Sequence, residues 1–211
     1  MKPPVLTAST ISYLFASEWA PANESWPLHV PNATVDGPVT AGNLLNIAIW
    51  RLRDQDVVAV EQLRPYEVEK VGPLRKPSFA RLTVIDASVE LPGLQGALLR
   101  ALKANPDEDD RGIRRVIALL GLAWQGPWTA AAGYCLGEAK AAGVAELGGR
   151  RWHPIRKPVI TNRAAHEALR PKHDEIRAAR KACREAHEEL DNAVLADCLH
   201  ALHWAHGEAA D

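Results

Sequence analysis

Four residues near the end of the chain have the types and spacing that could bind a metal ion. Asp197, His200, His203 and His206 follow one another at intervals of three. On an α-helix each step of three turns by about −60°, so neighbouring members can contact one ion. The apolar stripe of this helix points elsewhere, and we expect Asp197 and His200 to face water. A metal site and a solvated row of polar residues both remain open, and no H-E-x-x-H arrangement favours the first.

A group of cations with one tryptophan could bind phosphate groups. It lies in a segment that we expect to be a β-hairpin, and further arginines lie on the helix before it. The residues of this anion- or lipid-binding candidate are Arg150, Arg151, Trp152, Arg156 and Lys157, with Arg111, Arg114 and Arg115 from the helix. Such cations bind phosphates, and an indole ring stacks on bases or lies at a membrane interface. The alternative is a charged hairpin that contacts only water.

No other motif in the sequence indicates catalysis. It contains no phosphate-binding loop, dinucleotide-binding glycine pattern, nucleophile elbow or set of kinase motifs. Carboxylates alternate with arginine and lysine, as around Glu185 and Glu189, and this pattern is typical of a solvated helix face. We therefore expect no enzymatic activity and no cofactor. An active site assembled from residues far apart in the sequence stays open as an alternative.

Composition and charge are those of an ordinary globular protein. The 211 residues are 47% hydrophobic and 24% charged, with a formal net charge of -1. This balance gives no overall attraction to nucleic acid or to an anionic membrane, so either contact needs a local basic patch. No apolar run approaches the about 20 residues of a membrane span, and no signal segment is recognisable. Cys135, Cys183 and Cys198 form no framework and predict free thiols in a reducing cytoplasm.

The elements that would position these residues are mostly helices. Helices are expected at 10–19, from Thr40 to 54, at 94–104, from 109 or 110 onward, from Thr129 to Gly143, and at 162–169, 174–190 and 192–206. β-type runs are expected at 57–63, 66–71 and 79–85, and a hairpin at 144–147 and 151–155. A helix followed by short strands is the pattern of a winged helix. The sequence thus predicts a mainly α, compact multi-helix domain with two short β-hairpin units.

The order of these elements resembles the Golgi phosphoprotein 3 family, including its bacterial relatives, from about Val39 to His206. The segment 41–51 looks like the family's G-x-x-L-x-E-L-A-L-R-G-R-[IL] helix, and 92–102 is similar to its D-x-L-L-D-E-A-L segment. Residues 138–144 resemble the L-x-x-x-G-[VI]-L end of its central helix, and 157–162 the stretch that follows the hairpin. The last helix, 196–206, looks like its A-L-L-A-L-x-x-A-H helix.

The resemblance implies a single domain over residues 1–211, with an N-terminal helix and loop at 1–38, and no enzymatic activity. Eukaryotic members of the family bind phosphatidylinositol 4-phosphate and the cytosolic tails of glycosyltransferases. The arginines of the family's lipid pocket have no counterpart here, since the matching central positions fall near Thr129 and Ala132. The hypothesis is a cytoplasmic, peripheral adaptor that binds an anionic membrane surface, a phospholipid headgroup or a protein partner. The alternative is a winged-helix nucleic-acid-binding or regulatory protein, with 129–140 as recognition helix.

Overall fold

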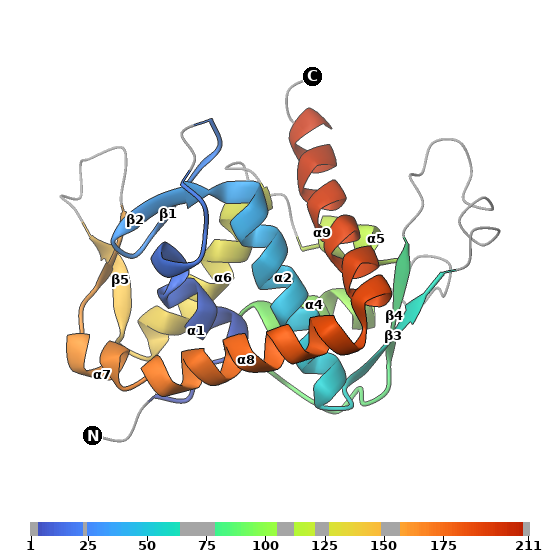
Figure 1. The fold of residues 1–211 in the computed structure, drawn as a ribbon, viewed down its shortest axis with the longest axis horizontal. Coiled ribbons are helices and arrows are strands. Elements are labelled where there is room, and N and C mark those ends of the chain that lie inside the picture. The colour runs from blue at the N-terminus through green and yellow to red at the C-terminus, as the bar shows by residue number, and fades with distance from the viewer. Residues whose placement is uncertain are drawn as a thin grey trace.

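The chain folds into packed helices with small hairpins at two ends (Figure 1). A computed structural model of the protein describes residues 4–22, 25–63, 79–104, 112–120, 127–148 and 157–208. The helices are α1 (Ala8–Leu14), the 3-10 turn η1 (Ala16–Glu18), α2 (Gly37–Asp54), α4 (Gly93–Ala104), α5 (Ile113–Ala118), α6 (Pro127–Ala141), α7 (Arg163–Glu167), α8 (Arg170–Ala186) and α9 (Glu188–Glu208). None of these described helices is long and apolar enough to cross a membrane.

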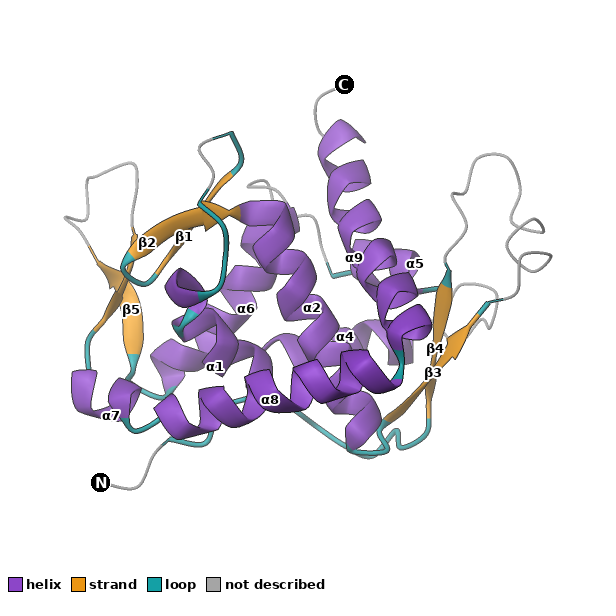
Figure 2. Cartoon of the chain, in the orientation of Figure 1, coloured by secondary structure: helices purple, strands orange, loops and turns teal. Residues whose placement is uncertain are grey.

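The strands form antiparallel hairpins, coloured orange in Figure 2. They are β1 (Pro27–Val30), β2 (Ala33–Asp36), β3 (Val58–Gln62), β4 (Ala80–Val84), β5 (Ala145–Gly148) and β6 (Lys157–Ile160). In the described part of the chain, β1 pairs with β2, β3 with β4, and β5 with β6. The predicted mainly α fold with short hairpins is confirmed, with one hairpin more than the sequence indicated.

The helix α2 passes through the middle of the molecule and begins earlier than predicted. Asp36 caps it, because its carboxylate accepts a hydrogen bond of 2.9 Å from the main-chain N–H of Val39. Thr40, the predicted cap, lies one turn inside the helix and is buried. Leu44 and Leu45 are fully buried on α2, which packs against α1, α6 and α9. The helix α2 is therefore the central element against which α1, α6 and α9 pack.

Two clusters of buried apolar side chains share the helices α1 and α6. Tyr13 and Cys135 belong to the larger cluster, which also includes α2, α4, α5, α9 and the hairpins β1–β2 and β3–β4. Leu14 and Ala139 belong to the smaller one, under α7 and α8. Leu136 on α6 packs against both. Because α1 and α6 line both clusters, movement of either helix would disturb both.

Three expected boundaries are wrong. The second strand of the late hairpin is Lys157–Ile160, where 151–155 was expected. The helix α8 begins at Arg170 with Pro171 in its first turn, a position that tolerates a missing N–H, so that proline does not interrupt it. The break between α8 and α9 falls at His187. The predicted strand at 66–71 and the predicted caps at 109 and 110 lie outside the described residues.

Two glycines on neighbouring helices make a matched test of this packing. A methyl group on Gly96 would collide with the main-chain oxygen of Leu91, whereas one on Gly137 would meet nothing within 4 Å. Gly96→Ala is expected to lower the free energy of unfolding by about 2 kcal/mol. Gly137→Ala is expected to raise it by about 0.5–1 kcal/mol, because alanine restricts the unfolded chain more than glycine does. Urea unfolding measures both, and equal shifts in one direction would contradict the packing of α4.

Candidate functional site

Most of the predicted anion-binding residues are not part of a described surface. Lys157 begins β6, and the other residues of the hairpin group, Arg150, Arg151, Trp152 and Arg156, lie outside the described residues, as does Arg111. The side chain of Arg115 is also outside the description. For these residues the anion-binding role stays a prediction.

Arg114 differs from that prediction, because it binds a carboxylate of its own chain. Its Nε donates to Oδ1 of Asp197 at 2.7 Å, and its guanidinium lies 4.9 Å from the ring centroid of Phe79. The Arg114 side chain is only 13% exposed. An arginine held in this way is positioned to hold α5 against α9, and it is not available as an open phosphate contact.

Two of the four predicted metal residues, Asp197 and His200, differ in burial. Asp197 was expected to face water, but it is fully buried and accepts hydrogen bonds from the amides of Phe79 and Ala80. Burial raises the pKa of this carboxyl, and the amides and Arg114 oppose that shift. His200 is exposed, as predicted. The side chains of His203 and His206 lie outside the description, and the described side chains contain no group of three or more metal-binding residues.

The three cysteines are free, as the sequence predicted. Cys135 on α6 and Cys198 on α9 are fully buried. Burial raises the pKa of the Cys135 thiol to about 12, so this thiol stays protonated and unreactive at neutral pH. These cysteines are therefore packing residues.

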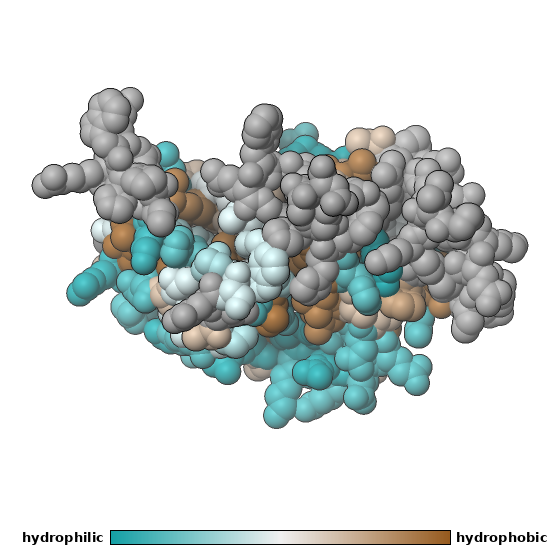
Figure 3. All heavy atoms as spheres, turned by 90° about the horizontal axis from the view of Figure 1, so that it is seen from above, coloured by the Kyte–Doolittle hydropathy of each residue, from teal (hydrophilic) through white to brown (hydrophobic). Residues whose placement is uncertain are grey.

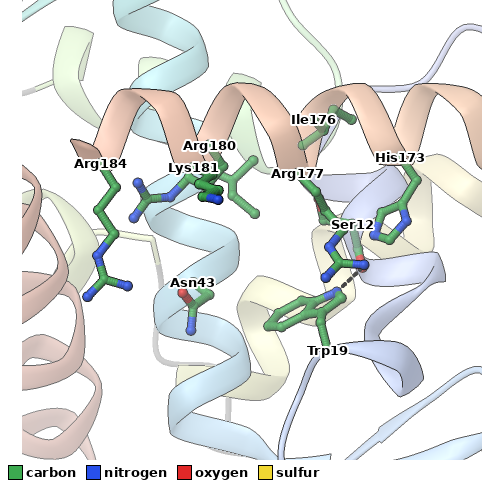
Figure 4. Close-up of a pocket in the computed structure, with 10 residues that line it drawn as sticks. Ser12, Trp19, Asn43, His173, Ile176, Arg177, Arg180, Lys181 and Arg184 are labelled. Carbon is green, nitrogen blue, oxygen red and sulfur yellow. Dashed lines mark hydrogen bonds between the residues drawn. The ribbon is translucent and has the colours of Figure 1, made fainter. Parts of the chain in front are cut away.

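The structure brings together a different group of cations, in a groove under α8. This groove, which we call the α8 groove, has a cavity volume of about 270 Å³. Its lining comes from α1, η1, α2 and α8, and comprises Ser12, Trp19, Asn43, Ile47, His173, Ile176, Arg177, Arg180, Lys181 and Arg184. Figure 4 shows the basic side chains extending from α8 toward Asn43 on α2 and toward Trp19. The lining thus combines an apolar and aromatic base with a cationic rim.

Arg180 is the fixed cation of the α8 groove. Its Nη2 donates to Oδ2 of Asp191 at 2.7 Å, and Asp191 is fully buried. Oδ1 of Asp191 accepts hydrogen bonds from Trp50 Nε1 at 2.7 Å and from Asn46 Nδ2 at 3.3 Å. Nη1 of Arg180 is buried and has no hydrogen-bond partner among the described residues. A buried donor without a partner costs about 1–3 kcal/mol, so an anion in the groove would relieve that cost.

The other three cations are exposed and lie along one side of α8. Within the described part of the chain, Arg177 and Arg184 form no ion pair, and Lys181 has only a 3.8 Å contact with Glu185, four residues on. An exposed pair of this kind contributes little. In Figure 3 the lower edge of the molecule, which is the side facing the viewer in Figure 1, is covered mainly by hydrophilic residues. The rim of the α8 groove therefore carries positive charge that its own chain leaves largely uncompensated.

The base of the groove is formed by rings and aliphatic side chains. Nε1 of Trp19 donates to the main-chain oxygen of Ser12 at 3.0 Å, and this bond holds the indole in place (Figure 4). Ile176 is buried beside it on α8. His173 is fully buried, stacks on Phe15 with ring centroids 4.6 Å apart, and has no hydrogen-bond partner for either ring nitrogen among the described residues. Such a base suits a ligand with a ring or a short apolar part next to its charge.

The spacing of the four cations is a sequence signal for this site. Residues 177, 180, 181 and 184 are spaced by three, one and three, so they lie on one face of a helix. Of the acidic residues of α8, Glu175 lies on the opposite side, whereas Asp174 and Glu185 border the basic face, and Glu185 contacts Lys181. Alternation of charge along the chain hid this one-sided distribution. No spacing rule, however, could have indicated that Trp19 and Asn43 face the same cations.

Comparison with known proteins yields no relative. No family model matches the chain, no curated protein matches it, and no solved structure matches its fold. The resemblance to the Golgi phosphoprotein 3 family therefore stays a prediction, and the function has to be inferred from the α8 groove.

Proposed function

We propose that the protein is a non-enzymatic peripheral adaptor whose α8 groove binds the phosphate of an anionic phospholipid headgroup. The observation that carries the proposal is Nη1 of Arg180, a buried charged donor without a partner at the wall of a cationic groove. Asp191 holds the Arg180 guanidinium in place, so binding costs little conformational entropy at this side chain. Arginine guanidinium groups are well suited to phosphate, because their N–H groups can bond two of its oxygens at once.

The position of the cations supports contact with a surface. Arg177, Lys181 and Arg184 are exposed at the rim, where long cationic side chains can reach lipid headgroups. Each Lys or Arg near an anionic membrane contributes about 1 kcal/mol, so the rim alone supplies about 3 kcal/mol. The chain's net charge of -1 gives no general attraction, so this local patch would also orient the protein.

The groove's lining favours binding over catalysis. Ser12 is its one hydroxyl, and a nucleophilic serine needs a base within hydrogen-bond reach. His173 lines the same groove, but neither of its ring nitrogens has a hydrogen-bond partner among the described residues. The groove therefore lacks a formed nucleophile and base pair, and its charged groups are the cations of α8, which can bind anions.

The nucleic-acid alternative finds less support. The helix α6, which would be the recognition helix, packs against α1, α2 and α4. Ala131, Ala132 and Cys135 are buried on it, and Lys140 is its one basic residue. A helix that reads bases needs a free polar face in the major groove. We therefore place this alternative second.

Sedimentation with lipid vesicles tests the proposal. Arg177→Gln with Arg184→Gln removes two rim cations and is expected to weaken binding to vesicles that contain phosphatidic acid by about 30-fold, from about 1 kcal/mol per cation. The matched control is Lys172→Gln with Arg163→Gln, which removes the same charge from exposed positions outside the groove. The control is expected to change binding less than about threefold.

Two outcomes would contradict the proposal. Equal binding of the wild-type protein to phosphatidylcholine vesicles and to anionic vesicles would exclude charge as the attraction. Equal losses in the two double variants would mean that total charge, and not the α8 groove, governs binding. Inhibition of the vesicle binding by added DNA at low salt, with a gel shift of its own, would favour the nucleic-acid alternative.

A further inference from the structure

His173 is an unusual residue for a groove lined by cations. It is fully buried at the base of the α8 groove and stacks on Phe15 at an interplanar angle of 18°. Both of its ring nitrogens lack a hydrogen-bond partner among the described residues. A buried imidazole normally has at least one partner, because an unpaired polar group costs about 1–3 kcal/mol. Figure 4 places the ring beside Ser12 and Arg177, and all three residues line the groove.

The charges around His173 balance in the absence of a ligand. On α8 they are Arg170, Asp174 and Arg177, with Nδ1 of His173 3.9 Å from the Asp174 carboxylate. Glu18 approaches from η1 and is already paired with Arg170 at 2.7 Å. From α7, His166 stacks on the same Phe15 ring, while α1 contributes only uncharged side chains. Burial is the main effect, and it lowers the pKa of His173 from its usual value.

We propose that His173 is a ligand-binding residue that takes up a proton when the α8 groove binds a dianion. The inference rests on the proposed function, and it specifies the ligand class as a phosphomonoester or a similar divalent oxyanion. At neutral pH the ligand-free ring is neutral. A dianion beside it stabilises the imidazolium form, which can donate hydrogen bonds from both nitrogens. The bound proton adds a positive charge at the base of the groove, about two helical turns before Arg180 on α8.

The protonation explains why a dianion would be preferred. A phosphodiester carries one negative charge, which Arg180 and the rim cations can neutralise without His173. The second charge of a monoester is what compensates for placing a proton on a buried ring. Affinity for a dianion is therefore expected to rise as the pH falls, whereas affinity for dimethyl phosphate, a monoanionic diester, is expected to change much less.

Isothermal titration with sulfate tests this linkage, because sulfate stays a dianion over the whole range. The wild-type protein is expected to bind sulfate about fivefold more tightly at about pH 6 than at about pH 8. At about pH 7 the heats should differ between buffers of different ionisation enthalpy, which reports proton uptake on binding. His173→Gln keeps a polar side chain of similar size without a titratable ring, and it should remove both the pH dependence and the proton uptake.

The outcomes separate this inference from the proposed function. Sulfate binding that is equal at both pH values, without proton uptake, overturns the role of His173 and leaves the groove as an anion site. No sulfate binding at either pH, or binding unchanged in Arg177→Gln with Arg184→Gln, overturns both. If His173→Gln does not fold, the wild-type titrations in the two buffers still decide. The vesicle assay separates a lipid headgroup from a soluble phosphate as the source of the dianion.

Discussion

Replacing Asp191 with alanine is expected to lower the free energy of unfolding by about 3–5 kcal/mol, because it leaves buried groups without their partner. The carboxylate accepts hydrogen bonds from Arg180, Trp50 and Asn46, which come from α8 and α2. Arg180 is the most costly of these to leave unpaired, since its side chain is only 19% exposed. Urea unfolding measures the loss of stability.

A neighbouring acidic residue serves as the control for Asp191. Asp54 makes an exposed contact with Arg51, 3.7 Å away and one helical turn back. Asp54→Ala is expected to change stability by less than about 0.5 kcal/mol. The double variant Asp191→Ala with Arg180→Met removes the unpaired charge and should recover part of the loss. A double variant as unstable as the sum of its single changes would mean that the two side chains do not interact.

Asp191→Ala is also expected to weaken ligand binding in the α8 groove. Without Asp191, Arg180 loses the partner that fixes its guanidinium at the wall of the groove. Sulfate binding by Asp191→Ala, measured below its unfolding transition, is therefore expected to weaken together with stability. This coupling between α9 and the site is a property of the three-dimensional contact, because Asp191 and Trp50 are far apart in the sequence.

The sequence predicted the helices well where an apolar stripe or a cap specified them. The stripe of α4 and the Asn162 cap of α7, whose Oδ1 accepts from the Ala165 N–H at 2.9 Å, both lie where they were expected. Gly143 has the positive φ of 69° that a residue just past a helix end requires. Caps and apolar stripes depend on residues close together in the sequence, so they can be recognised without knowledge of the tertiary structure.

The hairpins were harder to predict because their strands have only four or five residues each. The turn between β1 and β2 is Pro31-Asn32, and Asn32 has a φ of 65°. A proline followed by a residue of positive φ is the pattern of a type II turn, which the proline-rich loop concealed. The strand β6, which pairs with β5, was hard to recognise because it contains Pro158, and proline is uncommon inside a strand.

The site was predicted least well, because it depends on packing between distant segments. The sequence indicated that anion binding would need a local basic patch, and it favoured the cations between Arg150 and Lys157. What distinguishes α8 is that His173 and Ile176 are its only buried residues, so the side chains of its later turns, near α9, stay largely exposed. Trp19, which follows η1, and Asn43 on α2 also line the groove, and neither residue is near α8 in the sequence.

Replacing Glu138 is expected to have the second largest effect on stability, since this residue on α6 bonds the start of α1, the helix that contributes Ser12 to the groove. Its carboxylate, almost fully buried on α6, accepts hydrogen bonds from the N–H and Oγ1 of Thr7, both at 2.7 Å, and from Oγ1 of Thr10 at 2.6 Å. These bonds position α1, and through it Ser12, whose main-chain oxygen holds Trp19. Glu138→Ala is expected to lower the free energy of unfolding by about 3 kcal/mol, because three donors lose a charged acceptor.

An exposed glutamate on the following strand serves as the control for Glu138→Ala. Glu146 on β5 is exposed, and Glu146→Ala is expected to change stability by less than about 0.5 kcal/mol. Trp19 supplies a second measurement, because freeing α1 would expose its indole to water and shift its fluorescence to longer wavelength. Wild-type stability of Glu138→Ala would mean that α1 is held by its apolar contacts alone. The groove's aromatic wall would then have to be fixed by Phe15 and Leu14, which pack in the smaller core cluster.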